Sequence, residues 1–403
     1  MKIGIIGGGA SGLACAVTVA RKARKLNKNT SVFILESKDK VGRKLLATGN
    51  GRCNMLNTDS DPFYFSVKDF HKFAIQRYDC KSNLEFFASM GLYTRCDEEG
   101  RVYPLSNQAA SVLDCLRNEC SNLDVIMRND FTVTDIKKVN GGFIVNNEEK
   151  FDVIVLACGG KALVKDFNGY DILRRLGHKT TDAYPSLSKL NTVDTADVKQ
   201  LQGIRHKATL RLAAGSQIVA EEKGEILFAK YGISGIAVMQ LSAFVTRSPE
   251  VNYTVTADFI PDMSFKFVRD CICRIISSNP SLRCESILEG FMPKKLGEVV
   301  VKSVGVKIDS KCSCLSSDDI NNIVDKAKKY TFKIDSVRGF EDAQVTAGGA
   351  DTRFFDSRTM ESKLVPGLYC IGELLDVDGL CGGYNLMWAW SSGRLCGESI
   401  KIK

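Results

Sequence analysis

The stretch KIGIIGGGASGLACAVTVARK, residues 2–22, decides the fold of this chain. Gly7, Gly9 and Gly12 have the GxGxxG spacing, with a short apolar run before them and a helical pattern after them. In such a motif the first glycine permits a tight turn, the second lets the backbone approach a pyrophosphate, and the third lets helix and strand pack closely. The stretch therefore predicts a strand–turn–helix unit whose helix N-terminus, beginning near Ala10 and Ser11, receives phosphates.

The next apolar run strengthens this prediction. SVFILE, residues 31–36, is typical of a second strand, and it ends in Glu36. A carboxylate at this point accepts hydrogen bonds from the ribose hydroxyls of an adenosine. Strand, glycines, helix, strand and acid together predict a bound dinucleotide, whereas GxGxxG alone would be a weak signal.

The segment behind Glu36 favours FAD over NAD. SKDKVGRKLLATGNGRCNMLN, residues 37–57, alternates glycines, bases and asparagines, which a domain that binds only NAD does not need. A loop of this composition can wrap over the phosphates and the flavin edge of a cofactor. The alternative is a surface loop with solvated charges. The candidate cofactor ligands here are Arg43, Lys44, Gly51, Arg52 and Asn54.

Two further segments bring the chain back toward the same cofactor. FTVTDIKKVNGGFIVNN, residues 131–147, predicts a β-hairpin, and FDVIVLACGG, residues 151–160, predicts an apolar strand that returns beside the adenine and ends near Gly159. The chain contains one complete GxGxxG, so a separate NAD(P)H domain of the glutathione-reductase kind is not expected.

The carboxyl end carries the second half of the predicted site. A strand is expected just before Gly372 and Glu373, where a backbone turn would meet the ribityl chain. In CGGYNLMWAWSSG, residues 381–393, Gly383 would permit a tight turn into a helix that starts near Tyr384 or Asn385. The N-terminus of this helix would face the pyrimidine edge of the flavin, which gains negative charge on reduction. Trp390 is interpreted as a packing residue; for Trp388 packing is favoured, and contact with the cofactor's surroundings is the alternative.

The composition of the chain argues against several other classes of function. The net charge of +8 is spread along the chain, and no basic run is interleaved with aromatic residues, so no nucleic-acid partner is expected. No apolar stretch is long enough for a membrane span, and we expect a cytoplasmic protein whose fifteen cysteines are reduced. No cysteine or histidine spacing indicates a metal site, and no nucleophile–base pair is recognisable. The catalytic residues and the oligomeric state stay open.

The predicted fold class is α/β. A Rossmann-like FAD-binding domain of the glutathione-reductase type would comprise residues 1–186 and 339–403. An inserted substrate or cap domain, residues 187–338, would interrupt it, with a β-barrel-like part at 187–262 and a helical part at 263–328.

Several motifs together resemble one known family. GGGASG, GRKLLATGNGRCN, LACGG, VTAGGA and above all GELLDVDGLCGGYNLMWAWSSG are similar to the aminoacetone oxidase-like bacterial flavoproteins, a group that includes dehydro-bile-acid reductases. The resemblance spans nearly the full chain. It implies a noncovalent FAD, held by both chain ends. The contacts that it implies are Gly9, Ala10, Ser11, Glu36, Lys44, Gly51, Arg52, Asn54, Val133 (through its backbone), Gly372, Glu373, Asp376, Tyr384, Asn385 and Leu386.

This chain departs from the family pattern at two places. Lys230 stands where a histidine is common, so no role of that histidine carries over, and Cys158 stands where threonine is usual. The expected activity is FAD-dependent oxidation or reduction of a small organic substrate, with NAD(P)H as a candidate donor and O2 as a candidate acceptor. A flavin-binding sensor and a flavin-dependent RNA-modifying protein are the alternatives.

Overall fold

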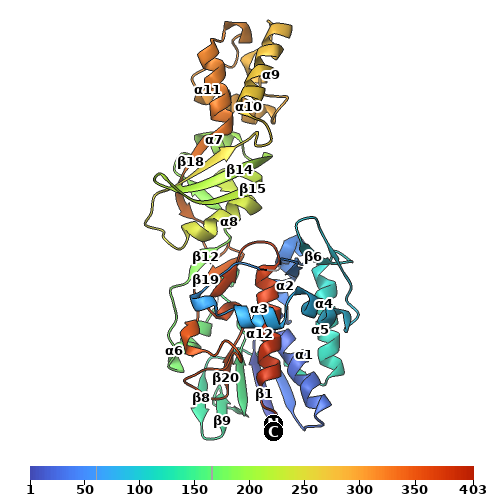
Figure 1. The fold of residues 1–403 in the computed structure, drawn as a ribbon. Helices are drawn as coiled ribbons and strands as arrows, with labels where there is room; N and C mark the ends of the chain where they lie inside the picture. The colour runs from blue at the N-terminus through green and yellow to red at the C-terminus, as the bar shows by residue number, and fades with distance from the viewer. Residues whose placement is uncertain (60, 165–166) are drawn as a thin grey trace. The chain divides into compact units, whose positions relative to one another are not determined.

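The computed structural model describes residues 1–59, 61–164 and 167–403. The chain forms two compact units, one of Met1–Tyr184 with Val345–Lys403 and one of Pro185–Gln344 (Figure 1). The second unit thus begins two residues before the predicted insert and ends six residues after it. The strand β12 (Tyr184–Ser186) lies where the chain passes from the first unit into the second.

The first unit is built on a parallel five-stranded sheet in the order β20-β11-β1-β2-β7. Its central strand β1 is almost entirely buried, as apolar residues on both faces of a parallel sheet require. The bounds are β1 Lys2–Ile6, β2 Ser31–Leu35, β7 Ile126–Arg128, β11 Val153–Leu156 and β20 Leu368–Cys370. The strand β20 comes from the carboxyl end of the chain, so the sheet contains residues from both ends.

The helices and smaller sheets of the first unit surround this sheet. The helices are α1 Ala10–Lys25, α2 Arg43–Ala47, α3 Lys72–Arg77, α4 Cys80–Ala88, α5 Ala109–Asn122, α6 Gly169–Arg175 and α12 Tyr384–Ser399. Short 3-10 turns are η1 Thr48–Gly51, η2 Val67–Asp69, η5 Thr352–Phe354 and η6 Gly372–Leu374. The remaining strands are β3 Leu56–Asn57, β4 Tyr64–Ser66, β5 Thr94–Cys96, β6 Arg101–Pro104, β8 Ile136–Val139, β9 Gly142–Val145, β10 Glu149–Phe151, β19 Val345–Ala347 and β21 Val377–Gly379.

The first and last helices of the chain, α1 and α12, pack closely against each other (Figure 1). Two glycines on α12 allow this, because a Cβ on Gly393 would lie 2.4 Å from the Ser11 carbonyl oxygen and one on Gly397 would lie 2.8 Å from Thr18 Cβ. Real Cβ atoms do not approach other atoms so closely, so a side chain at either position would push the helices apart. This contact brings the carboxyl end of the chain to the glycine-rich turn.

The second unit contains a closed six-stranded barrel in the order β13-β16-β15-β14-β17-β18. Its strands are β13 Leu190–Thr192, β14 Arg205–Ala214, β15 Gln217–Ala229, β16 Gly232–Ser234, β17 Tyr253–Asp258 and β18 Tyr330–Val337. The predicted barrel-like range, 187–262, is wrong at its end, because β18 lies beyond the helical part. The helical part of the unit separates β18 from the other barrel strands in the sequence. The local sequence pattern therefore did not assign β18 to the barrel.

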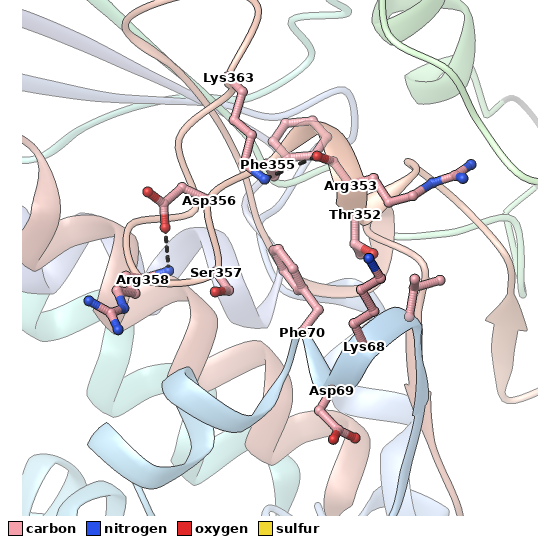
Figure 2. A pocket seen from close by; sticks show the side chains of 11 residues that line it. Lys68, Asp69, Phe70, Thr352, Arg353, Phe355, Asp356, Ser357, Arg358 and Lys363 are labelled. Atoms are coloured by element: carbon pink, nitrogen blue, oxygen red, sulfur yellow. Dashed lines mark hydrogen bonds between the residues drawn. The ribbon is translucent and has the colours of Figure 1, made fainter.

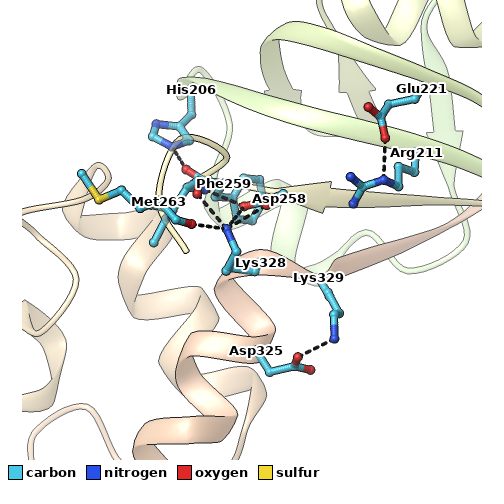
Figure 3. A network of polar contacts seen from close by, with 10 residues as sticks. His206, Arg211, Glu221, Asp258, Phe259, Met263, Asp325, Lys328 and Lys329 are labelled. Carbon is cyan, nitrogen blue, oxygen red and sulfur yellow. Dashed lines mark hydrogen bonds and ion pairs between the residues drawn. The ribbon is translucent and has the colours of Figure 1, made fainter. Parts of the chain in front are cut away.

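The helices of the second unit are α7 Ala196–Gln200, α8 Ile236–Val245, α9 Phe265–Ser278, α10 Lys294–Ser303 and α11 Ser317–Lys328, with 3-10 turns η3 Cys284–Ser286 and η4 Cys312–Cys314. A partly buried lysine, Lys328, connects the end of α11 to the barrel (Figure 3). Lys328 Nζ lies 2.9 Å from Asp258 Oδ2, at the end of β17, and donates to the carbonyl oxygens of Ile260 and Met263, each at 2.8 Å. The ammonium therefore fixes the point at which the chain leaves the barrel and the point at which it returns.

Within the described ranges, no helix has the length and apolar character that crossing a membrane demands.

Candidate functional site

The glycine-rich turn has the geometry that its spacing predicts. Gly7 has φ of 105°, a value that favours glycine, and a Cβ there would lie 2.5 Å from the Ala157 carbonyl oxygen. A Cβ on Gly12 would lie 2.1 Å from the Gly7 carbonyl oxygen, which shows how closely α1 packs on the turn. Around Gly9, in contrast, no atom lies within 4 Å of a Cβ position. The middle glycine thus borders open space, where a ligand's pyrophosphate could approach the backbone.

The start of α1 adds donors to this open space. Gly9 is the N-cap residue, and no side chain caps the helix there. The first turn, which includes Ala10 and Ser11, carries no acidic residue that would compete with an anion for its N–H groups. An uncapped helix N-terminus next to an unfilled glycine turn fits a phosphate group.

Glu36 lies beside the same turn, at the end of β2. Its Oε2 accepts a hydrogen bond from the Gly8 N–H at 2.9 Å, and its Oε1 accepts one from the Lys38 N–H at 3.0 Å. These two bonds orient the carboxylate. Oε1 also accepts the Ser37 hydroxyl at 3.3 Å, whereas Oε2 has a second lone pair with which it could accept a ribose hydroxyl.

Lys44 and Glu373 form an ion pair between the loop after β2 and the carboxyl end, with 2.7 Å between Nζ and Oε2. Glu373 Oε1 also accepts the N–H of Thr346 at 2.9 Å. Residues far apart in sequence therefore meet at the predicted ribityl turn. Thr346 was not predicted, and the VTAGGA motif that contains it was the available signal.

Hydrogen bonds with two side chains of α12 fix the backbone of the turn at Gly372. Trp388 Nε1 donates to the Gly372 carbonyl oxygen at 3.0 Å, and the Gly372 N–H donates to Ser392 Oγ at 3.1 Å. A Cβ on Gly372 would lie 2.5 Å from Ser11 Oγ. Trp388 and Trp390 are both buried, as packing residues should be. The indole of Trp388 has the further role of orienting this turn, which the sequence did not reveal.

The N-terminus of α12 packs on β3. The helix starts at Tyr384, as predicted, and Gly383 is its N-cap residue with φ of 100°. A Cβ on Gly383 would lie 2.3 Å from the Leu56 carbonyl oxygen. The backbone of Leu56 therefore excludes a side chain at this position, in addition to the turn that Gly383 was expected to permit. With its amide suitably oriented, Asn54 accepts the Gly383 N–H and donates to the Leu56 carbonyl oxygen, each at 3.2 Å.

Tyr384, Asn385 and Leu386 form the first turn of α12. The Tyr384 hydroxyl donates to Asp59 Oδ2 at 3.2 Å, and burial together with that carboxylate raises the pKa of Tyr384 to about 12. The phenol therefore stays protonated at neutral pH. Asn385 bonds both the N–H and the carbonyl oxygen of Gly379 through its side chain, so it secures the segment before the helix. Leu386 is half-buried and packs against the core.

Other predicted residues lie around the same unit with different partners. Arg43 is exposed and pairs with Asp39 at 3.1 Å, and the Arg52 guanidinium lies over the Tyr103 ring, 5.2 Å from its centroid. Asp376 Oδ2 accepts the Thr181 hydroxyl at 3.0 Å. Gly51 and Gly159 both border open space. These contacts do not by themselves bring the five residues into one cluster.

The structure corrects the predicted position of Val133. It was assigned to the hairpin, but β8 begins only at Ile136, so Val133 lies in the segment before it. Its side chain is buried, and its carbonyl oxygen accepts a hydrogen bond from Asn168 Nδ2 at 2.8 Å.

Groups that could do acid–base or metal chemistry are sparse in the described part of the chain. Burial raises the pKa of Cys158 to about 12, so it is a neutral thiol. Each histidine ring is engaged in a hydrogen bond, with Ser66, Ser362 or the Phe259 carbonyl oxygen. No group of three or more metal-ligating side chains gathers within residues 1–59, 61–164 and 167–403.

The parallel sheet, the glycine turn and the acid at the end of β2 define a dinucleotide-binding protein of the Rossmann class. The model of the HI0933-like protein Rossmann domain matches residues 1–399, and the chain belongs to that family.

Curated relatives match over almost their whole length. A 3-dehydro-bile acid delta(4,6)-reductase of Clostridium scindens is 37% identical, with 99% of this chain and 98% of the relative covered. A ribosomal RNA dihydrouridine synthase of Haemophilus influenzae is 31% identical, with 98% and 97% covered, and one of Escherichia coli is 28% identical with the same coverage. Among solved structures, a 3-ketosteroid-delta4-(5alpha)-dehydrogenase of Rhodococcus jostii matches at 12% identity over 98% of this chain and 96% of its own, with a TM-score of 0.46.

The Leu56 contact predicts the effect of a side chain at residue 383. Gly383→Ala should lower the free energy of unfolding by about 2–4 kcal/mol, because strain at positive φ and a clash with backbone add together. Gly177 has φ of 84° but no atom within 4 Å of its Cβ position, so Gly177→Ala is the matched control. It should cost only about 1 kcal/mol. Urea unfolding measures both; equal losses would mean that the Leu56 contact contributes nothing.

Proposed function

We propose that this protein is an FAD-dependent reductase of the glutathione-reductase structural type that acts on a small organic molecule. The observation that carries the proposal is the unfilled space at Gly9, bordered by the uncapped N-terminus of α1 and by the oriented carboxylate of Glu36. The relative at 37% identity, a reductase of 3-dehydro-bile acids, supports both the reaction class and a steroid-like substrate.

The chain's own residues would bind the cofactor as follows. The N–H groups of Ala10 and Ser11 would meet the pyrophosphate, and Glu36 would accept the adenosine ribose hydroxyls. The turn at Gly372, held by Trp388 and Ser392, would lie along the ribityl chain. The N-terminus of α12 would face the pyrimidine edge, where its partial positive charge stabilises an anion by about 0.3–1 kcal/mol or more when buried.

Bound FAD would supply hydride transfer, and the protein would orient and tune it. The partly buried ion pair of Lys44 and Glu373, together with the bond from the Thr346 N–H, would keep the predicted flavin-side turn in one geometry. NAD(P)H is the proposed donor. Since the sequence holds one GxGxxG, we propose that the donor binds transiently rather than in a second dinucleotide domain.

The first prediction of this proposal concerns FAD itself. The purified chain should bind FAD noncovalently, and acid should release FAD rather than FMN. Glu36→Ala should weaken FAD by about tenfold, because the ribose hydroxyls lose their acceptor. Glu98→Ala removes an exposed carboxylate of the same unit that has no part in the predicted site, and it should leave FAD affinity unchanged. A protein that binds no FAD, or that loses equal affinity in both variants, would contradict the assignment.

A second candidate function is reduction of a uracil base in ribosomal RNA. It is favoured by the relatives named ribosomal RNA dihydrouridine synthases, which match at 31% and 28% identity over nearly their full length. The sequence shows no basic run interleaved with aromatic residues, and the bile-acid relative is more similar. We therefore place the small-molecule activity first.

Turnover with the two kinds of acceptor separates these candidates. With NADH or NADPH as donor, we expect a 3-dehydro-bile acid to be reduced and ribosomal RNA to gain no dihydrouridine, as measured by mass spectrometry of both products. Dihydrouridine formation without bile-acid reduction would establish the second candidate. Flavin binding without turnover of either would favour a flavin-binding sensor.

A further inference from the structure

Thr346, on β19, bonds two segments that lie far apart in the sequence. Its backbone N–H donates to Glu373 Oε1 at 2.9 Å, and its hydroxyl oxygen accepts the N–H of Ala162 at 3.0 Å. Ala162 comes after β11 and Glu373 after β20, and these two strands are neighbours in the parallel sheet. We call these three residues the Thr346 junction. It lies beyond the carboxyl ends of parallel strands, which is where such sheets bind their ligands.

The Thr346 junction is closed to solvent. Thr346 is 2% exposed and Ala162 is 0% exposed. Gly160 leaves room for the junction, because a Cβ on Gly160 would lie 2.5 Å from Thr346 Oγ1 and 2.7 Å from Glu373 Oε1. A backbone N–H that loses its acceptor in such surroundings is costly, so the junction holds the two segments in one arrangement.

The junction connects residues that are predicted to bind the cofactor, although Thr346 is not one of them. Gly159, three residues before Ala162, borders open space. The second carboxylate oxygen of Glu373, Oε2, pairs with Lys44 at 2.7 Å. A change at Thr346 would therefore reach the predicted flavin-side turn through Glu373, and it would reach the segment 159–162 through Ala162.

The cavity of the first unit that Figure 2 shows is a different place. It has about 420 Å³ and is lined by residues 67–70, 352–353, 355–358 and Lys363, so it includes no residue of the Thr346 junction. Its aromatic side chains, Phe70 and Phe355, are buried, and Lys68 and Arg358 lie on opposite sides of it (Figure 2). This cavity therefore gives no second explanation for an effect of Thr346 on the cofactor.

We propose that Thr346 is a positioning residue of the cofactor site, which holds the segment 159–162 and the flavin-side turn in the geometry that receives FAD. This inference rests on the proposed FAD-dependent function. A site that already has its bound geometry loses less free energy to ordering when the ligand arrives. Breaking the junction should therefore weaken FAD binding even in a protein that stays folded.

Thr346→Val tests the proposal, because valine has nearly the same shape but offers no acceptor to the Ala162 N–H. The segment 159–162 could then satisfy its N–H groups in another arrangement, and FAD would have to restore the original one. We expect FAD affinity, measured by flavin fluorescence well below the melting temperature, to fall at least about tenfold. Thr346→Ser keeps the hydroxyl and should stay within about threefold of the unchanged chain.

Thr192→Val is the matched control. Thr192 is also a buried threonine of a β-strand, 4% exposed, and its hydroxyl donates to the Asp194 carbonyl oxygen at 2.9 Å. It belongs to the second unit, so its loss should lower the melting temperature but change FAD affinity less than about twofold. At saturating FAD, the absorption bands of the bound flavin should shift in Thr346→Val and stay in place in Thr192→Val.

Gly160→Ala disturbs the same junction from its other side and replaces Thr346→Val if that variant does not fold. The added Cβ would displace the Thr346 hydroxyl and the Glu373 carboxylate, so FAD affinity should again fall at least about tenfold.

The proposal is overturned if the folded junction variant binds FAD with unchanged affinity, if Thr192→Val loses as much affinity, or if Thr346→Ser fails to restore it. An unchanged chain that binds no FAD would refute the proposed function and this inference with it. Full affinity in Thr346→Val would refute this inference alone, so the two failures are distinguishable.

Discussion

The contact between α1 and α12 is the constraint on which the rest of the first unit depends. Gly393 and Gly397 lie where a side chain would collide with Ser11, Thr18 and the backbone at Cys15, so the two helices can approach closely. Through this contact the last helix of the chain packs on the first. The predicted site consequently contains residues from positions 7 to 54 and from positions 372 to 386, although more than 300 residues separate these segments.

Buried polar contacts convert this packing into a defined geometry. The indole of Trp388 and the hydroxyl of Ser392 both bond the backbone of Gly372, and Glu373 is shared by Lys44 and the Thr346 N–H. Each of these groups is wholly or partly buried, where an unsatisfied polar group is costly, so alternatives to this arrangement are disfavoured. The open space at Gly9 lies beside this region because Ser11, on the first turn of α1, contacts Gly372.

Local sequence pattern was sufficient wherever one segment determines its own conformation. The glycine turn, Glu36 at the end of β2 and the start of α12 at Tyr384 followed from spacing and periodicity, because steric rules act over a few residues. Contacts between distant segments did not follow. The bond from Trp388 to Gly372, the contact of Gly383 with Leu56 and the closure of the barrel by β18 each join segments that no local pattern relates. The spacing of Gly393 and Gly397, one helical turn apart, was the one signal of the α1–α12 contact available in the sequence.

The most direct test of this account is the FAD affinity of a chain whose α1–α12 contact has been opened. Gly393→Leu places a side chain against Ser11, whereas Glu398→Leu adds the same side chain at an exposed position of the same helix. The account predicts that Gly393→Leu weakens FAD binding by about tenfold or more while Glu398→Leu retains it. A Gly393→Leu protein that melts at a lower temperature but binds FAD with full affinity would contradict the claim that this contact builds the site.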